Sequence, residues 1–333
     1  MSMAFEALRE AIRARASPPA PQPAALAAAR ALAAAGGASV LGIVFFGSRR
    51  TQAGCDPWSA YDFFVLTRDY QSFYRRLRAG GALSRSPTLH AALNAVLPPS
   101  QLSFRTGSEG GFLHAKCAVI TLTTLLREAS GKRRDHFCIG RLFQPTEILY
   151  AESPAVREQI LDALVNAYSL TYSWGRPWLP PRFDADAYGR TLLRVSLRGE
   201  IRAEPAGRAE ALWEAQRPEQ APLFRLLLRE LAARGDLVEA DEPGRYALAR
   251  AVSLGERVRW RAYFAWSKVR ATIRWFKYVL TFEGWLDYIL RKARRHGGEE
   301  IVLAPHERRM PLLFLWPRLF RHLREKDKKG GGE

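Results

Sequence analysis

The chain has 333 residues, 51 Lys and Arg against 33 Asp and Glu, and a formal net charge of +18. A hydrophobic content of 47% excludes a disordered chain, and the length allows two domains or one domain with appendages. The charge predicts a polyanionic partner, which is nucleic acid, an anionic membrane or a phosphorylated substrate. Three cysteines without a CxxC pair indicate free thiols, and we expect no secretory signal and no membrane-spanning helix.

Apolar runs and helical periodicity define the elements of the first half. The predicted helices are residues 3–15, 24–35, 69–78 and 154–170. The predicted strands are residues 43–46, 61–67, 101–105 and 113–121, with a short helix, a proline stop and a fifth strand within 133–150. Beyond a linker at 177–182 we expect helices at 186–201, 208–216 and 222–234, then a hairpin of 237–239 and 246–248. Helices followed by a small hairpin are typical of a winged helix.

Gly47 and Ser48 follow an apolar strand, and Asp62 opens the next strand between Tyr61 and Phe63. A glycine lets phosphates approach the backbone, where N–H groups and a hydroxyl can hold them. A carboxylate in an apolar setting is costly unless it is paired or metal-bound, so Asp62 is a candidate Mg²⁺ ligand. This arrangement is typical of polymerase-β-like nucleotidyltransferases. The structural alternatives are a tight turn at Gly47 and a capped or salt-bridged carboxylate at Asp62.

The nucleotidyltransferase pattern has a second acid two residues from the first, and this chain has none at either offset from Asp62. The candidates for a second metal ligand, among which spacing does not choose, are Asp56, Asp69, Glu109 and Asp135. Lys116 interrupts an apolar strand and Arg141 follows a glycine, so both are candidate phosphate ligands. A solvent-facing lysine and an arginine paired with an acid are the alternatives.

We therefore predict an α+β fold with three parts. A polymerase-β-like nucleotidyltransferase domain with N-terminal helices covers residues 1–176, and a winged-helix-like domain covers 177–252. A basic, aromatic, amphipathic region covers 253–333. Between Arg257 and Lys329 nineteen basic and seven acidic residues give a net +12, and five of the nine tryptophans lie in the same stretch.

Four segments together resemble the mitochondrial-type phosphatidate cytidylyltransferases, the translocator assembly and maintenance protein family. They are FFGS at 45–48, YDFFVL at 61–66 with Asp69 beyond it, HAKCAVI at 114–120 and IGRLFQP at 139–145. The similarity covers residues 40–175, and the Ala- and Arg-rich composition is that of a bacterial member. The chain departs from the family pattern at Phe45 and Gln144, where the family has Gly and Lys, and after Tyr172-Ser173, where WGR replaces GD.

The resemblance implies transfer of CMP from CTP to phosphatidic acid, which yields CDP-diacylglycerol and pyrophosphate with Mg²⁺. Gly47, Ser48 and Lys116 would hold the CTP phosphates, Asp62 the metal, and Lys116 and Arg141 the developing charge. It also implies a nucleotidyltransferase domain, a winged-helix-like domain and a C-terminal membrane-associating helix. We expect a cytoplasmic enzyme, peripheral on the inner face of the membrane.

The basic C-terminal region predicts how the protein meets that membrane. Arg270, Arg274 and Lys277 form one stripe, with Trp275 and Trp316 among the aromatic residues, as in a helix that lies on anionic lipid. Packing on the protein's own core and binding of single-stranded nucleic acid are the alternatives. Two other functions stay open: a nucleotidyltransferase that acts on RNA or a small soluble acceptor, and an inactive nucleotidyltransferase fold used as a binding module.

Overall fold

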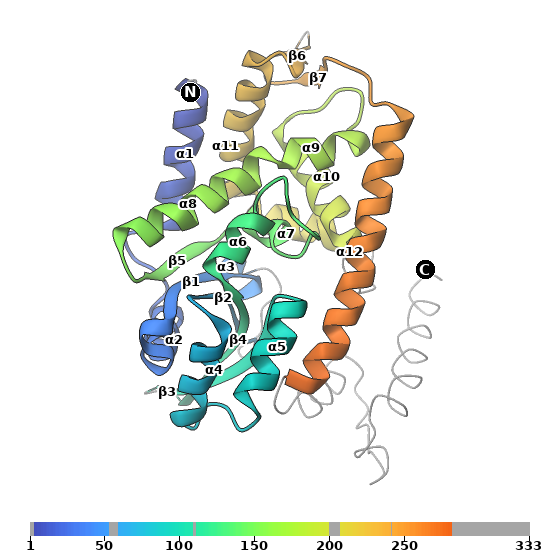
Figure 1. Cartoon of the computed structure of the whole chain (residues 1–333). Coiled ribbons are helices and arrows are strands. Elements are labelled where there is room, and N and C mark those ends of the chain that lie inside the picture. Colours follow the sequence, from blue (N-terminus) through green and yellow to red (C-terminus); the bar gives the residue numbers. More distant parts are fainter. Residues whose placement is uncertain (1–2, 53–58, 109–110, 200–206, 241, 282–333) are drawn as a thin grey trace, which may run out of the picture. The chain divides into compact units, whose positions relative to one another are not determined.

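A mixed five-stranded sheet organises the first half of the chain (Figure 1). The computed structural model describes residues 3–52, 59–108, 111–199, 207–240 and 242–281. The strand order is β3-β4-β2-β1-β5, where β2 runs parallel to β4 and the other neighbours are antiparallel. The strands are β1 (Val40–Phe46), β2 (Tyr61–Thr67), β3 (Ser100–Ser108), β4 (Gly111–Thr121) and β5 (Glu147–Ala151). This confirms the predicted α+β class and the predicted strands.

The sheet is buried on both faces because its strands alternate two sets of apolar side chains. Phe63 and Val65 belong to one core, which is covered by α2 (Pro23–Gly36), α4 (Tyr70–Ala79) and α5 (Pro87–Val96). Phe64 and Leu66 belong to the other core, under α6 (Leu122–Glu128) and α8 (Pro154–Ser169). Helices α2, α4 and α8 were predicted, whereas α5 and α6 were not.

The second core continues from the sheet into a group of helices. Phe64 of the sheet, Leu164 of α8 and Phe224 of α11 belong to one cluster. This cluster therefore contains residues from both sides of the predicted domain boundary at residue 176. The N-terminal α1 returns to this group, where Arg9 bonds Asp162 at 2.6 Å. The remaining elements here are α1 (Met3–Ala16), α7 (Ile139–Leu142), α9 (Thr171–Gly175), α10 (Ala185–Arg198) and α11 (Arg208–Ala233), with the hairpin of β6 (Leu237–Glu239) and β7 (Tyr246–Leu248).

Helix α11 corrects one prediction. We expected separate helices at 208–216 and 222–234, but a single helix of 26 residues runs through Pro218 and Pro222. Each proline removes a backbone hydrogen bond and normally breaks a helix. Here the buried side chains on both sides of the prolines, Trp213 and Phe224 among them, pack into one core and hold the two halves in line.

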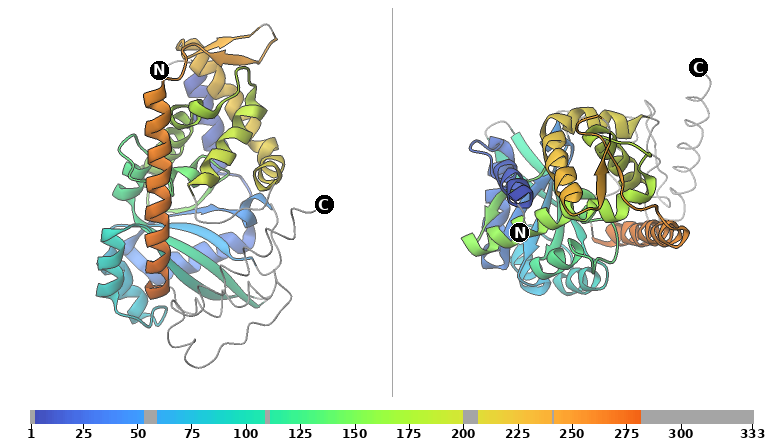
Figure 2. Two further views of the ribbon diagram at one scale, coloured as in Figure 1. Left: turned by 90° about the vertical axis from the view of Figure 1, so that its right-hand side faces the viewer. Right: turned by 90° about the horizontal axis from the view of Figure 1, so that it is seen from above.

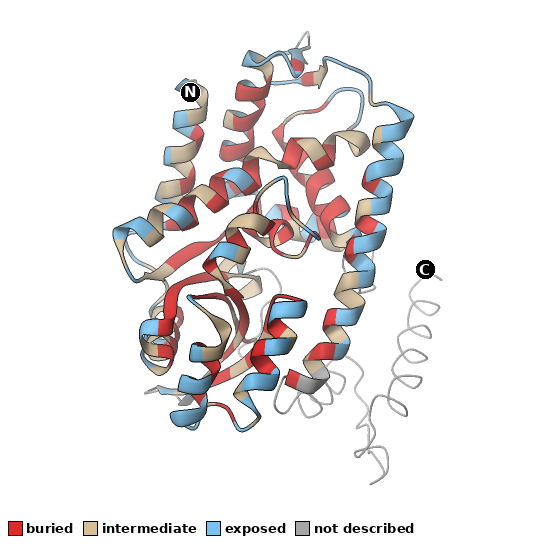
Figure 3. Cartoon of the chain, in the orientation of Figure 1, coloured by how far each residue is buried: buried red, intermediate tan, exposed pale blue. Residues whose placement is uncertain are grey.

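Helix α12 (Leu254–Thr281) runs alongside both the helices and the sheet (Figure 2). Its inner face is buried, from Trp260 and Phe264 to Lys277, and its outer face is exposed along most of its length (Figure 3). No helix of the part of the chain that the structure describes is both long and apolar enough to span a bilayer. Trp316 lies outside the described residues.

Candidate active site

The turn after β1 has a conformation that only glycine adopts readily. Gly47 has φ of 88° and ψ of −168°, and its carbonyl accepts hydrogen bonds from the amides of Arg50 and Thr51 at 3.0 and 3.1 Å. A Cβ on Gly47 would lie 2.6 Å from Oδ2 of Asp62. The Asp62 carboxylate therefore occupies the space that a side chain would fill, directly against the turn.

Asp62 and Lys116 are neighbours across the sheet. Asp62 of β2 pairs with Phe46 of β1 and with Lys116 of β4, and Lys116 pairs in turn with Ser103 of β3. Paired residues direct their side chains to the same face of a sheet, so a carboxylate and an amine share one row beside the Gly47 turn. Among the described residues, no hydrogen bond or salt bridge engages the half-buried Asp62 carboxylate.

Two arginines of α3 (Ser48–Thr51) surround the turn, and we did not predict a role for either. Nε of Arg49 donates to the carbonyl of Ser59 at 2.8 Å, and its guanidinium lies 5.0 Å from the Tyr61 ring centre. Arg50 is nearly buried; it forms an ion pair with Glu147 at 2.6 Å and a hydrogen-bonded ion pair with Glu219 of α11 at 2.7 Å. Burial raises the pKa of Glu147, the Arg50 charge opposes that rise, and Glu219 adds to it.

The predicted second metal ligand is not beside Asp62 in the described part of the chain. Asp69 follows the far end of β2, about 16 Å or more away at 3.3 Å per residue, and caps α4 by accepting from the Ser72 amide at 2.8 Å. Asp135 is buried in ion pairs with Arg270 and Arg274 at 2.8 and 2.7 Å. Asp69 is therefore too far from Asp62 to share a metal with it, and Asp135 is already engaged by two arginines, while Asp56 and Glu109 lie outside the described residues.

The donor set at the turn would suit a magnesium ion that is bound in part by phosphate groups. The described residues contain no group of three His, Cys, Asp or Glu side chains able to enclose a metal. Mg²⁺ commonly uses one or two carboxylates together with substrate phosphates rather than an all-protein cage. Asp62, unpaired among the described residues and held against a turn that admits no side chain, suits that mode of binding.

The rings of Phe137 and Phe64 connect Arg141 to the sheet face that carries Asp62 and Lys116. Its guanidinium is 3.9 Å from the centre of the Phe137 ring, which packs edge-to-face on Phe64 at 6.3 Å. Phe64 is two residues from Asp62 on the same face of β2. Gly140 allows this position, because a Cβ there would lie 2.8 Å from Oγ of Ser196. The structure thus places Arg141 near the sheet face that carries Asp62 and Lys116, but not in their row.

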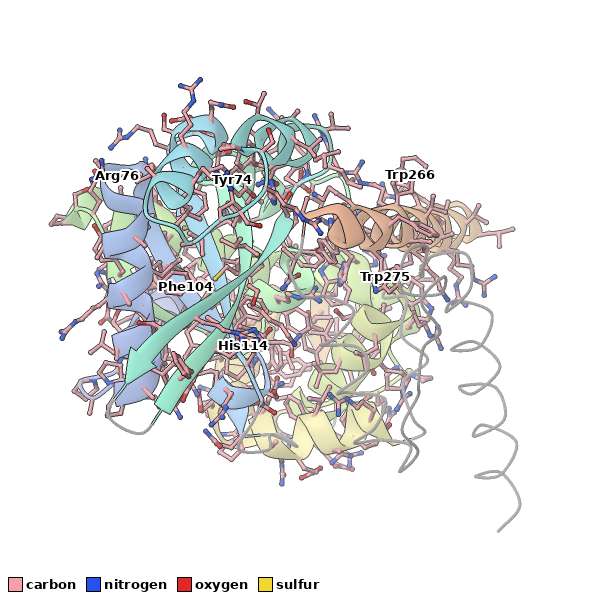
Figure 4. All side chains as sticks on the ribbon, turned by 90° about the horizontal axis from the view of Figure 1, so that it is seen from below. Tyr74, Arg76, Phe104, His114, Trp266 and Trp275 are labelled. Carbon is pink, nitrogen blue, oxygen red and sulfur yellow. The ribbon has the colours of Figure 1, made fainter. Side chains whose placement is uncertain are left out.

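The basic stripe predicted to contact lipid faces the protein instead. Arg274 is 2% exposed and Lys277 is 6% exposed, and Arg270 bonds the buried Asp135. Nζ of Lys277 donates to the carbonyls of Leu97 and Pro99, the latter at 2.9 Å. The predicted orientation of this stripe is therefore wrong. Trp275 is half-buried and lies on a different side of α12 from the exposed Trp266 (Figure 4).

The outer face of α12 is apolar with basic flanks. Its large apolar residues recur at helical spacing and are 43–77% exposed: Leu254, Val258, Trp266, Val269, Ile273 and Phe276. The charged residues exposed beside them on this helix are all basic: Arg257, Arg259, Arg261 and Lys268. We call this surface the outer α12 face.

Comparison with known proteins adds no relative to these observations. No protein-family model matches the chain, and no curated protein sequence matches it. The geometry of the described residues therefore carries the functional argument alone.

Proposed function

We propose that this protein is a CTP:phosphatidate cytidylyltransferase built on a polymerase-β-like nucleotidyltransferase domain, with a winged-helix-like helical part that ends in the β6–β7 hairpin. The observation that carries the proposal is the Asp62 carboxylate held against the Gly47 turn with Lys116 paired beside it. A glycine turn, one carboxylate and one amine are the groups that a metal-bound nucleoside triphosphate requires.

In the proposed reaction the turn at Gly47 and Ser48 binds the CTP phosphates, and Lys116 offsets their charge. Asp62 would hold Mg²⁺, which, when bound, neutralises the triphosphate and orients the α-phosphate. An oxygen of the phosphatidate monoester attacks the α-phosphorus in line, and the bond from that phosphorus to the β-phosphate bridging oxygen breaks, so that pyrophosphate leaves. The attacking phosphate is already anionic, so no side chain needs to remove a proton.

The outer α12 face supports an acceptor in the membrane. An apolar stripe flanked by basic residues is the pattern of a helix that lies in the interface of an anionic bilayer. Because its exposed flanks carry only positive charge, a second copy of the same face would be repelled. We therefore assign peripheral attachment at the cytoplasmic side of the membrane to this face and not to Arg270, Arg274 and Lys277.

The net charge of +18 also favours a second candidate, a nucleotidyltransferase with an RNA acceptor. One assay separates the two. The full chain is incubated with labelled CTP, Mg²⁺ and vesicles that contain phosphatidic acid, or with RNA in place of the vesicles. We expect label in the lipid phase, and transfer to RNA alone would overturn the lipid assignment.

The matched variants for this assay are Asp62→Asn and Asp69→Asn. Asp62→Asn removes the charge against the Gly47 turn and is expected to abolish transfer. Asp69 follows the far end of β2, and an asparagine there retains the ability to cap α4, so Asp69→Asn is expected to keep wild-type activity. Activity that survives in Asp62→Asn would show that the metal assignment is wrong.

A further inference from the structure

The inner face of α12 contributes to a cluster in which positive charge exceeds negative charge. Two guanidinium groups lie over the Phe137 ring: that of Arg274 is 4.8 Å from the ring centre, and that of Arg141 is 3.9 Å from it. Arg270 completes the set of arginines, and the buried amine of Lys277 lies beside Arg270 and Arg274. Asp135 is the carboxylate that pairs with Arg270 and Arg274. We call these residues, together with Tyr278, the Phe137 cluster.

Two buried donors of this cluster have no hydrogen-bond partner among the described residues. Nε and Nη2 of Arg274 donate to the carbonyl of Pro98, and Nη2 also bonds Asp135, but Nη1 bonds nothing. The Tyr278 hydroxyl is likewise buried and without a partner. Buried polar groups in folded proteins are nearly always satisfied, so two orphaned donors near the same cations indicate a missing acceptor.

The electrostatics of the cluster agree with a missing anion. Burial and the charges of Arg274 and Arg270 lower the pKa of Lys277 to about 6. Burial raises the pKa of Tyr278 to about 12, and the charges of Arg274 and Arg141 act against that rise. A buried amine that is driven toward its neutral form by neighbouring cations lacks a compensating negative charge.

The number of orphaned donors indicates the kind of anion that would fill the site. Nη1 of Arg274 and the Tyr278 hydroxyl require at least two acceptor oxygens, and Arg270 and Arg274 together carry more positive charge than Asp135 offsets. A phosphomonoester has three terminal oxygens and a charge between −1.5 and −2 at pH 7, whereas a carboxylate has two oxygens and a single charge. Phe137, Arg141 and Arg270 are half-buried, so the cluster is in part accessible to solvent.

We propose that the Phe137 cluster binds a phosphomonoester group between Arg274, Tyr278 and Arg141, at a site separate from Asp62. Phe137 contacts Phe64, which is two residues, about 7 Å, along β2 from Asp62. The site therefore lies on the same sheet face as the candidate active site. The proposal does not depend on nucleotidyl transfer, because it rests on donors that the transfer mechanism does not use.

The test uses the full chain in phosphate-free buffer at pH 7.5. Inorganic phosphate is titrated at constant ionic strength, with chloride as the balancing anion, and thermal unfolding and calorimetric binding are measured. Wild type is expected to show a saturable rise in melting temperature with phosphate and none with chloride. The absence of a saturable response in wild type overturns the proposal.

The decisive variant is Tyr278→Phe, which removes an orphaned hydroxyl and breaks no hydrogen bond among the described residues. It is expected to unfold at a higher temperature than wild type without phosphate and to bind phosphate about tenfold more weakly. The matched control is Tyr172→Phe, which loses the bond from its hydroxyl to the Asp236 carbonyl and is expected to keep wild-type phosphate affinity. Equal phosphate affinity in wild type and Tyr278→Phe overturns the proposal.

Two further measurements identify the source of the phosphomonoester and separate the phosphate site from the proposed nucleotidyltransferase activity. Tyr278→Phe is compared with wild type on vesicles with phosphatidic acid and with soluble glycerol 3-phosphate. Weaker binding to the vesicles alone assigns a lipid headgroup, and weaker binding to both assigns any accessible phosphomonoester. Asp62→Asn is expected to bind inorganic phosphate like wild type, so loss of transfer with intact phosphate binding bears only on the nucleotidyltransferase proposal.

Discussion

Replacement of Gly47 by alanine tests the contact between the turn and Asp62 through stability, whatever the reaction is. The new Cβ would lie 2.6 Å from Oδ2, 3.1 Å from Cβ and 3.2 Å from Cγ of Asp62. The backbone at φ 88° and ψ −168° is also strained for any residue with a side chain, which costs on the order of 1–3 kcal/mol. Restoring a normal contact requires the Asp62 side chain to leave its rotamer, which costs a further ~0.5–1.5 kcal/mol.

Gly81→Ala is the matched control for backbone strain. Gly81 has a similar φ of 74°, but nothing lies within 4 Å of the position of its Cβ. Urea denaturation of both variants should therefore show a loss of unfolding free energy that is larger for Gly47→Ala by about 1 kcal/mol. In the proposed transferase, displacement of Asp62 by about 1 Å should also reduce the transfer rate about 100-fold, whereas Gly81→Ala should transfer at the wild-type rate.

A double-mutant cycle isolates the carboxylate. Asp62→Ala removes Oδ2 and Cγ and leaves only the contact at 3.1 Å, so Gly47→Ala should cost less in that background than in wild type. If Gly47→Ala and Gly81→Ala are equally destabilised, and the cost of Gly47→Ala is unchanged without the carboxylate, then Asp62 does not lie against the turn.

Three other predictions follow from buried charges and from the outer α12 face. Arg50→Ala leaves the carboxylate of Glu147 buried and should cost about 3 kcal/mol at pH 8. The cost should fall as the pH is lowered, because the raised pKa of Glu147 lets this carboxylate take up a proton at a higher pH than an exposed glutamate does. Urea denaturation of exposed Arg68→Ala should show less than about 1 kcal/mol, and equal costs for the two variants would refute the burial argument. Between its folded pKa of about 6 and its ordinary value of 10.5, Lys277 binds fewer protons in the folded state than in the unfolded state, so the free energy of unfolding rises with pH in that window. Relative to Lys277→Met, the slope should reach about 1.4 kcal/mol per pH unit. Parallel pH profiles of the two proteins would show that the pKa of Lys277 is not lowered. Ile273→Glu should abolish flotation with anionic liposomes, whereas Val238→Glu, at an equally exposed position on the hairpin, should not. Flotation of both variants would show that the outer α12 face does not bind the membrane.

Local chemistry made the elements of the sheet predictable. The strands are apolar runs between turn residues, and α4 and α8 start at side-chain caps, Asp69 and Ser153. Gly47, Asp62 and Lys116 could be chosen from their types and settings. Their alignment in one row could not, because it depends on the parallel pairing of β2 with β4, two strands that are more than 40 residues apart.

The errors have a common physical origin in partners that are distant in the sequence. Arg50 reads as a solvated loop arginine, because Glu147 and Glu219 follow it by about 100 and 170 residues. The stripe of Arg270, Arg274 and Lys277 shows that α12 is amphipathic, but periodicity does not say which face is covered. One signal was present: these residues continue the face of Trp260 and Phe264, which the core buries.

The return of α1 to α8 and α11 has a consequence for synthesis of the chain. Leu8, Ile12 and Ala16 of α1 are fully buried in the core that α11 completes, and α11 begins only at Arg208. At ribosomal rates of about 5–20 residues per second, the first helix waits roughly 10–40 s for that partner. During this interval the face of α1 that packs on α11 lacks that partner, so α1 cannot complete its native packing until α11 has been synthesised.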